Sequence, residues 1–207
     1  MPIVIETAIV AGWTGRDQAA LREHIAELSE LGVTPPSKTP LFYRVSAARV
    51  TCDQEIESTD TSSGEVEAVL LAARGKLWVG LGSDHTDREV EAYGVAVSKQ
   101  MCEKPIAPAF WAYDDVAAHW DQLELRSWIV EGGSEVLYQE GNLGSLLPAE
   151  ELISSAGLED GSVMFCGTFA ARDGIRPSDS FRYELVDPVL ERRISSRYLV
   201  RRLPLIH

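Results

Sequence analysis

Beyond residue 40, the sequence shows a series of short strand-type runs bounded by turn-forming residues. Runs rich in Val, Ile, Leu and aromatic residues, bounded by Gly, Pro, Ser or Asp, are typical of strands. Gly132 and Gly133 divide one of them into a predicted hairpin, and Arg74-Gly75 is expected to form a turn between two others. The runs occupy residues 41–46, 48–52, 64–73, 76–83, 125–141, 162–168, 180–186 and 195–203. This pattern predicts a β-rich α+β fold.

Helices are expected at the edges of these strands. The longest spans residues 14–33, where apolar residues recur at helical spacing, with Thr14 or Asp17 near its N-cap and Gly32 at its end. A proline loop over residues 33–40 follows it, because each proline removes an amide donor. The first strand is expected at Ile3–Val10, and shorter helices are expected within residues 87–101 and 148–158.

Composition narrows the classes of protein. The chain has 207 residues, of which 45% are hydrophobic and 25% charged, and its net charge is -13. No repeat or linker divides it, so we expect a single domain over residues 1–207. The acidic balance argues against nucleic-acid and anionic-membrane partners. The start does not read as a signal peptide, no apolar stretch is long enough to span a membrane, and the three cysteines lack CxxC spacing, which together predict a cytoplasmic location.

Glu65 and Glu67 stand two residues apart on an otherwise apolar strand, so both carboxylates face the same side. Asp84 directly follows the next strand, and a hairpin brings its end beside the start of its partner. Three carboxylates at one place suit a hard divalent cation such as Mg²⁺, Mn²⁺ or Ca²⁺. The alternative is that Glu65 and Glu67 lie on an edge strand and point to solvent.

Two further patterns carry chemistry. His24 and Glu27 are three residues apart on the predicted helix, a spacing that permits a contact in which the carboxylate orients the imidazole. Lys99 and Lys104 follow the acidic segment, and a lysine beside a metal binds a substrate carboxylate or a developing oxyanion. The alternatives are a polar helix shoulder and surface ammonium groups.

His85 lies next to Asp84, and a zinc site with Asp84 and Asp87 is a rival interpretation. No second histidine lies four residues away, so we reject zinc. Asp87, Glu89 and Glu91 are interpreted as a solvated face or as partners of Arg88.

The order of these motifs resembles the fumarylacetoacetate hydrolase superfamily. His24-x-x-Glu27 is similar to the water-activating dyad of that family, Glu65, Glu67 and Asp84 to its metal carboxylates, and Lys99 to its active-site lysine. The segments GSDHTDRE and SKQMCEKP are closer to an uncharacterised bacterial domain family, a compact branch of the same fold. The resemblance assigns substrate binding to Arg44, Arg88, Gln139 and Thr168.

The resemblance implies a mixed-β roll of the superfamily's C-terminal-domain type with peripheral helices. It also implies a homodimer and a Mg²⁺-dependent hydrolase that cleaves a C–C bond in a 2-oxo or 1,3-diketo acid through a metal-stabilised enolate. A decarboxylase, hydratase or tautomerase of a 2-oxo or 2-hydroxy-dienoic acid is the alternative on the same site. A non-catalytic protein that binds a metal or metabolite is the alternative of another class. Trimmed spacing between Glu67 and Asp84, and Phe169 after Gly-Thr, depart from the family pattern.

Overall fold

The computed structural model describes residues 3–30, 35–204 and 206, without the side chains of His24, Glu27, Leu28 and Glu30. Its largest sheet has six strands, with β13 and β1 parallel and the other neighbours antiparallel. Their order is β10 (Trp111–Ala112), β7 (Lys76–Ser83), β6 (Val66–Ala73), β13 (Ser162–Phe165), β1 (Thr7–Gly12) and β2 (Leu41–Val45). Strand β1 thus begins at Thr7, later than the expected Ile3.

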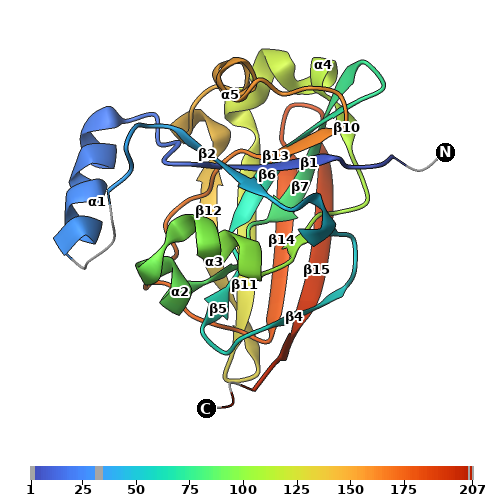
Figure 1. Cartoon of the computed structure of the whole chain (residues 1–207). Helices are drawn as coiled ribbons and strands as arrows, with labels where there is room; N and C mark the ends of the chain where they lie inside the picture. Colours follow the sequence, from blue (N-terminus) through green and yellow to red (C-terminus); the bar gives the residue numbers. More distant parts are fainter. Residues whose placement is uncertain (1–2, 31–34, 205, 207) are drawn as a thin grey trace.

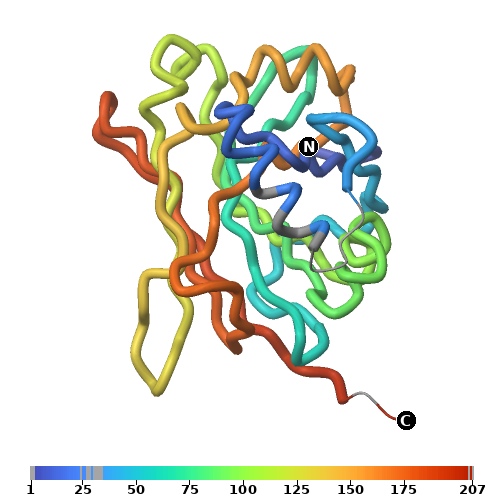
Figure 2. Tube along the Cα trace, turned by 90° about the vertical axis from the view of Figure 1, so that its left-hand side faces the viewer, coloured from blue at the N-terminus to red at the C-terminus, as the bar shows by residue number. Residues whose placement is uncertain are grey.

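A second sheet packs against the first (Figure 1). Its order is β12 (Ser134–Asn142), β11 (Glu124–Glu131), β14 (Ser180–Asp187), β15 (Arg192–Arg202) and β4 (Glu55–Ser58). Figure 2 shows the turns of its two long hairpins at opposite ends, the β11–β12 turn in yellow and the β14–β15 turn in red. Two small pairs complete the sheets, β3 (Val50–Thr51) with β9 (Lys104–Pro105) and β5 (Ser62–Ser63) with β8 (Thr86–Asp87).

The main core lies between the two large sheets. Leu70 and Leu81 from the six-stranded sheet meet Leu125 and Phe181 from the five-stranded one, and all four are at most 2% exposed. Alternate residues of β6 face a second apolar cluster on the opposite side, so every residue of β6 is buried. This explains why its sequence reads as a continuous apolar run and not as an alternating one.

The β6–β7 hairpin has the predicted turn. Arg74 and Gly75 both have positive φ, 59° and 67°, which suits the twist of a two-residue hairpin turn. The register pairs Ala73 with Lys76 at the turn and Val66 with Ser83 at the far end. The residues that flank this far end therefore lie side by side.

Helices lie at the edges of the sheets, as expected (Figure 1). Helix α1 (Gln18–Glu30) begins after Asp17, whose carboxylate accepts hydrogen bonds from the amides of Ala19 at 2.8 Å and Ala20 at 3.1 Å. Asp17, not Thr14, is thus the N-cap. The expected end at Gly32 lies outside the described residues. The remaining α-helices are α2 (Arg88–Tyr93), α3 (Val95–Met101), α4 (Tyr113–Val116) and α5 (Ala149–Ala156), and 3₁₀ turns span Ala47–Arg49, Ala117–Gln122 and Leu143–Ser145.

Two details differ from the sequence prediction. The segment expected to hold one short helix contains two, because the backbone is extended at Gly94 between α2 and α3. Strands β4, β5, β8, β9 and β10 and helix α4 lie outside the predicted elements, since they are two to four residues long and carry no periodicity. Helix α5 confirms the prediction for residues 148–158 and ends at Gly157, whose φ of 61° forms a left-handed cap.

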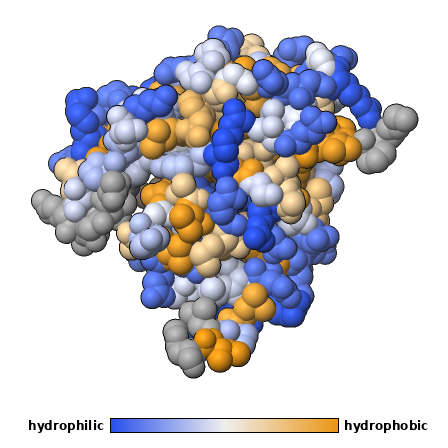
Figure 3. All heavy atoms as spheres, in the orientation of Figure 1, coloured by the Kyte–Doolittle hydropathy of each residue, from blue (hydrophilic) through white to orange (hydrophobic). Residues whose placement is uncertain are grey.

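Hydrophobic and hydrophilic side chains are intermixed on the face shown in Figure 3. The exposed apolar residues of the chain include Tyr93, Val97 and Met101 on α2 and α3. Among the described residues, no helix combines the length and apolar character that crossing a membrane requires.

Candidate metal centre

The far end of the β6–β7 hairpin gathers three carboxylates. Glu65 directly precedes β6, Glu67 lies within it, and Asp84 directly follows β7. One oxygen from each of the three lies within 4.8 Å of the others. The Asp84 amide donates to the Glu65 carbonyl oxygen at 3.0 Å, which extends the strand pairing to these two residues. Glu67 is 2% exposed and Asp84 is fully buried, so water solvates little of this negative charge.

Three cationic side chains lie against two of these carboxylates, Glu65 and Asp84. The Lys99 ammonium contacts Asp84 Oδ2 and lies 4.0 Å from Glu65 Oε2. The Lys104 ammonium lies 3.0 Å from Asp84 Oδ1, on the other side of the same carboxylate. The Arg88 guanidinium lies 3.3 Å from Glu65 Oε1. Two of the four lysines in the chain are thus buried against one aspartate.

Burial by itself raises the pKa of Asp84, but the two ammonium groups outweigh burial and hold that pKa well below its ordinary value. Burial acts in the opposite sense on Lys99, and the Asp84 and Glu65 carboxylates outweigh it, so its pKa lies above the ordinary value. Asp84 and Lys99 are therefore both charged at neutral pH.

Glu67 has a different environment. Its Oε2 accepts a hydrogen bond of 2.6 Å from the Gly167 amide. Burial, followed by the neighbouring charges of Asp84 and Glu65, raises the pKa of Glu67 well above its ordinary value. Gly167 has a φ of 101°, and a Cβ there would lie 1.9 Å from Thr14 Oγ1, so only glycine fits. The ionised form of Glu67 therefore needs a further positive charge, which a bound cation supplies.

The segment that carries Lys104 is fixed to β7 by close backbone contact. Gly82 forms a bridge with Ile106, and the Ala107 amide donates to the Leu81 carbonyl oxygen at 2.8 Å. A Cβ at Gly82 would lie 3.1 Å from the Pro105 carbonyl oxygen and 2.7 Å from Phe165 and Val69 atoms, so a side chain there would disturb the packing of this segment on β7. Gly82 thus lets the segment of Lys104 lie directly against β7, close to Asp84.

Arg88 connects the metal centre to helix α2. Its Nε donates to Ser63 Oγ at 2.7 Å, and its Nη1 donates to Glu91 at 2.8 Å. Asp87 is 2% exposed and caps α2 by accepting from the Val90 amide at 3.0 Å. The prediction of a solvated Asp87 is therefore wrong, and the pairing of Glu91 with Arg88 is confirmed.

His85 is a buried hydrogen-bond partner and does not join the carboxylate cluster. Its Nδ1 lies 2.9 Å from Tyr198 Oη and its Nε2 2.9 Å from Ser62 Oγ. Burial, helped by Lys104 and Arg88, lowers the pKa of His85 to about 3. Both ring nitrogens of this neutral imidazole are engaged, which agrees with the rejection of a zinc site.

The residues assigned to substrate binding by resemblance differ in position. Gln139 is 1% exposed, and its amide bonds Val66 N, Ser127 Oγ, Thr168 Oγ1 and the Phe169 carbonyl oxygen. Thr168 Oγ1 donates to the Val66 carbonyl oxygen at 2.7 Å. Gln139 and Thr168 therefore hold the backbone of Val66 at the start of β6, between Glu65 and Glu67. Arg44 is exposed on β2, where its carbonyl oxygen accepts a hydrogen bond from Gln100.

His24 and Glu27 lie on α1, and their side chains are outside the described part of the structure. Their proposed contact with each other and with the carboxylates stays a prediction.

Three groups of this centre were not assigned from sequence. Lys104 was noted only as a companion of Lys99, although its place before Pro105 in a lysine-poor chain was a usable signal. The Gly167 amide carries no side-chain signal. Tyr43, whose ring centre lies 5.9 Å from the Lys99 ammonium, comes from a distant strand and was invisible to local patterns.

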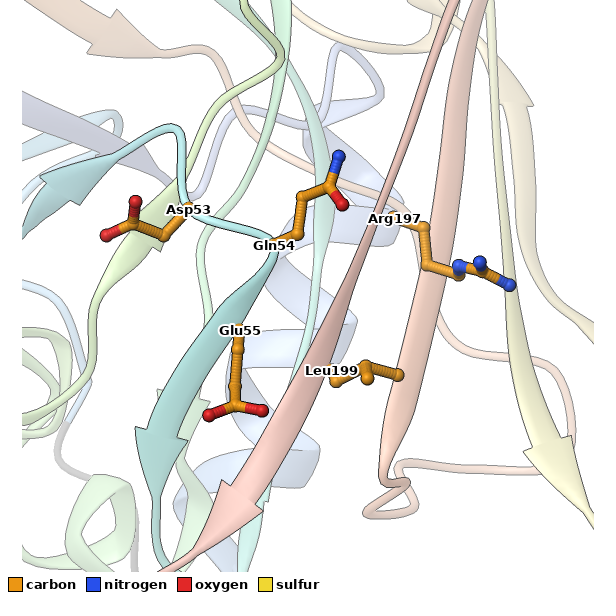
Figure 4. A pocket seen from close by; sticks show the side chains of 5 residues that line it. All are labelled: Asp53, Gln54, Glu55, Arg197 and Leu199. Carbon is orange, nitrogen blue, oxygen red and sulfur yellow. The ribbon is translucent and has the colours of Figure 1, made fainter.

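A separate depression of about 520 Å³ lies between β4 and β15, lined by Asp53, Gln54, Glu55, Arg197 and Leu199. All five residues are exposed. Figure 4 shows the two carboxylates and the Arg197 guanidinium pointing to different sides of their strands. Because these groups do not converge, the carboxylate cluster remains the stronger candidate for chemistry.

Solved structures share this fold throughout the chain. A structure of 2-keto-3-deoxyarabinonate dehydratase has a TM-score of 0.71 and 16% identity and covers 99% of this chain and 76% of its own. The 5-carboxymethyl-2-hydroxymuconate delta-isomerase from Mycobacterium smegmatis has a TM-score of 0.65 and 17% identity, with 99% and 82% covered. The dehydratase complexed with magnesium and 2,5-dioxopentanoate has a TM-score of 0.66 and 17% identity, with 98% and 75% covered.

These structures show that the chain has the fold expected from the resemblance to the fumarylacetoacetate hydrolase superfamily, so the predicted mixed-β roll with peripheral helices is confirmed. The chain belongs to the family described as "Protein of unknown function (DUF2848)", whose model matches residues 11–198. No curated protein matches the sequence at a significant level.

Proposed function

We propose that this protein is an enzyme that acts on a 2-oxo acid with a divalent cation, Mg²⁺ first, held by Glu65, Glu67 and Asp84. The convergence of these three carboxylates within 4.8 Å at a buried strand end carries the proposal. The donor set fits a hard cation because all three ligands are carboxylate oxygens. Asp84 Oδ1 is buried and has no hydrogen-bond partner among the described residues; the Lys104 ammonium lies 3.0 Å from it as an ion-pair partner.

The cation, when bound, supplies Lewis-acid charge to the carboxylate and keto oxygens of a 2-oxo acid. Lys99 places an ammonium group beside it, suited to a substrate carboxylate or to negative charge that develops during reaction. Arg88 orients Glu65, and the Gly167 amide orients Glu67. Arg44, Gln139 and Thr168 are proposed to bind or support the substrate, Gln139 and Thr168 through the backbone of β6.

For the reaction we propose hydrolysis of a C–C bond in an acylpyruvate-like acid. His24, held by Glu27, accepts a proton from the water that attacks the distal carbonyl carbon. The C–C bond then breaks, its electron pair passes to the 2-oxo acid fragment as an enolate, and that fragment takes up the proton from His24. Dehydration or isomerisation of a related 2-oxo acid is the second candidate, supported by the dehydratase and isomerase activities in the names of structures with this fold. Either reaction uses the same carboxylates and Lys99.

A non-catalytic metal-binding protein is the rival of another class. A scaffold needs no ammonium inside its ligand cluster, and burying Lys99 there costs desolvation energy. The rival predicts cation binding without turnover of any 2-oxo acid.

Cation binding is tested by calorimetric titration of the protein with MgCl2 and MnCl2. Glu67→Gln removes a ligand charge while keeping an oxygen for the Gly167 amide, so its fold should persist. Mutating a residue that hydrogen-bonds to a metal ligand typically weakens metal binding about 10–100-fold. Mutating the ligand itself should weaken it at least as much. Unchanged Mg²⁺ affinity in Glu67→Gln would place the cation elsewhere.

The reaction is tested by screening acylpyruvates, oxaloacetate and 2-hydroxy-dienoates with Mg²⁺ and following loss of enol absorbance. His24→Ala should then lower hydrolysis by about 10²–10⁴-fold with cation affinity unchanged, because a general base is not a ligand. Full hydrolytic turnover by His24→Ala would leave dehydration or isomerisation as the better assignment.

The homodimer and the cytoplasmic location stay predictions. Light scattering at micromolar concentration tests the first, and a monomer mass would contradict it.

A further inference from the structure

The two buried lysines that share Asp84 are held in different ways. Lys104 is fully buried, lies 3.0 Å from Asp84 Oδ1 and donates to the His85 carbonyl oxygen at 2.6 Å. It therefore ties the carboxylate to the backbone of the next residue. Because β9 pairs with β3 and its chain continues onto β7, the Lys104 backbone is fixed as well.

Lys99 enters the carboxylate cluster itself. It comes from the last turn of α3, contacts Asp84 Oδ2 and lies 4.0 Å from Glu65 Oε2, so its ammonium lies beside two of the three carboxylates. Within the part of the chain that the structure describes, its hydrogen bond and ion pairs in this cluster are with carboxylate side chains and not with a backbone carbonyl. Its other neighbour is the Tyr43 ring, 5.9 Å away. A divalent cation bound to the same carboxylate oxygens would therefore compete with the Lys99 ammonium for this position.

We propose that these lysines have opposite effects on cation binding: Lys104 positions Asp84 for the cation, and Lys99 competes with the cation for Asp84. Cation binding releases the Lys99 ammonium from Asp84 and leaves it free to pair with a substrate carboxylate. The inference rests on the proposed divalent-cation site and makes Lys104 a positioning residue. It implies that the cation binds before the substrate, because Lys99 becomes available to a substrate carboxylate only then.

Simple charge repulsion makes a different prediction. Removing either positive charge would strengthen the binding of a cation, since like charges repel at short distance. If Lys104 positions Asp84, removing Lys104 weakens cation binding, whereas removing Lys99 still strengthens it. The sign of the change in affinity therefore separates the two explanations without any knowledge of the substrate.

The experiment is a calorimetric titration with MgCl2 of the wild-type protein and of Lys99→Met, Lys104→Met, Lys104→Gln and Lys76→Met. Lys76 is exposed at the turn end of β7, so Lys76→Met is a control for the loss of one charge. Lys99→Met should bind Mg²⁺ roughly tenfold more tightly. Lys104→Met should bind it about 10–100-fold more weakly. Lys104→Gln keeps a donor for the His85 carbonyl oxygen and should recover most of that loss.

Folding of each variant is checked by circular dichroism and thermal melting. In a parallel titration, the electron paramagnetic resonance signal of free Mn²⁺ gives an independent affinity. If wild-type protein binds neither Mg²⁺ nor Mn²⁺, the proposed cation site falls and this inference falls with it. If wild-type protein binds but both lysine variants shift affinity in the same direction, only this inference is overturned. If the Lys104 variants do not fold, Lys99→Met decides, and unchanged or weaker binding overturns the competition.

Discussion

The far end of the β6–β7 hairpin and the outer face of the five-stranded sheet carry the same kinds of charged side chain in opposite surroundings. In the first region, Asp84 and Lys104 are fully buried. In the second, Arg126 pairs with Glu124 and Glu140, and Arg201 pairs with Glu55, all at least partly exposed. Water screens the second set, so each of its pairs contributes little to stability. Charge in the first set is retained against a desolvation cost, which is typical of a functional site.

The largest expected effect comes from breaking the buried region at its centre. Asp84→Asn leaves the Lys99 and Lys104 ammonium groups buried without their shared counter-charge. We expect it to lower the free energy of unfolding by about 3–5 kcal/mol, measured by chemical denaturation, and to abolish Mg²⁺ binding. A loss below about 1 kcal/mol would show that the cluster is hydrated like a surface pair.

A smaller effect on the free energy of unfolding is expected when the pH is raised. It arises from Tyr183, on the inner face of the five-stranded sheet whose outer face carries the exposed charges. Tyr183 alternates with Arg182 and Glu184 on β14 but points inward, where burial raises the pKa of its phenol to about 12. The unfolded phenol ionises near its ordinary pKa of about 10. The contribution of the neutral Tyr183 phenol to the free energy of unfolding is therefore fully present below about pH 10. It falls by roughly 2–3 kcal/mol as the pH rises toward 12.

Denaturation midpoints between pH 9 and 12 test this. Tyr183→Phe should flatten the part of the decline that Tyr183 causes. An equally steep decline in Tyr183→Phe would assign it to other groups, among which Tyr198 is also buried.

The smallest effect is expected on the exposed face. Glu135 lies 3.0 Å from the Arg182 guanidinium, which also stacks 3.6 Å from the Trp128 ring centre. Glu135→Gln keeps the stacking and removes only the ion pair, so the free energy of unfolding should fall by less than about 1 kcal/mol. Added salt should shrink the difference further. A cost above about 2 kcal/mol, in the same denaturation assay as Asp84→Asn, would remove the contrast between the two regions.

The sequence by itself determined what depends on local order. Strand periodicity, the Arg74-Gly75 turn and the two-residue spacing of Glu65 and Glu67 suffice to place three carboxylates at one hairpin end. A hairpin turn fixes the register, and the register decides which residues meet, so local information carried this part of the site.

Only the tertiary structure decided which residues surround that end. Lys104 reaches Asp84 because Gly82 admits its segment against β7, and the Gly167 amide reaches Glu67 because β13 pairs with β6. Gln139 arrives from the other sheet to hold the Val66 amide. The same lysine or glutamine is a surface residue or a buried partner depending on contacts made across many residues of chain. The free energy of burying a polar group depends on those contacts and not on its neighbours in sequence.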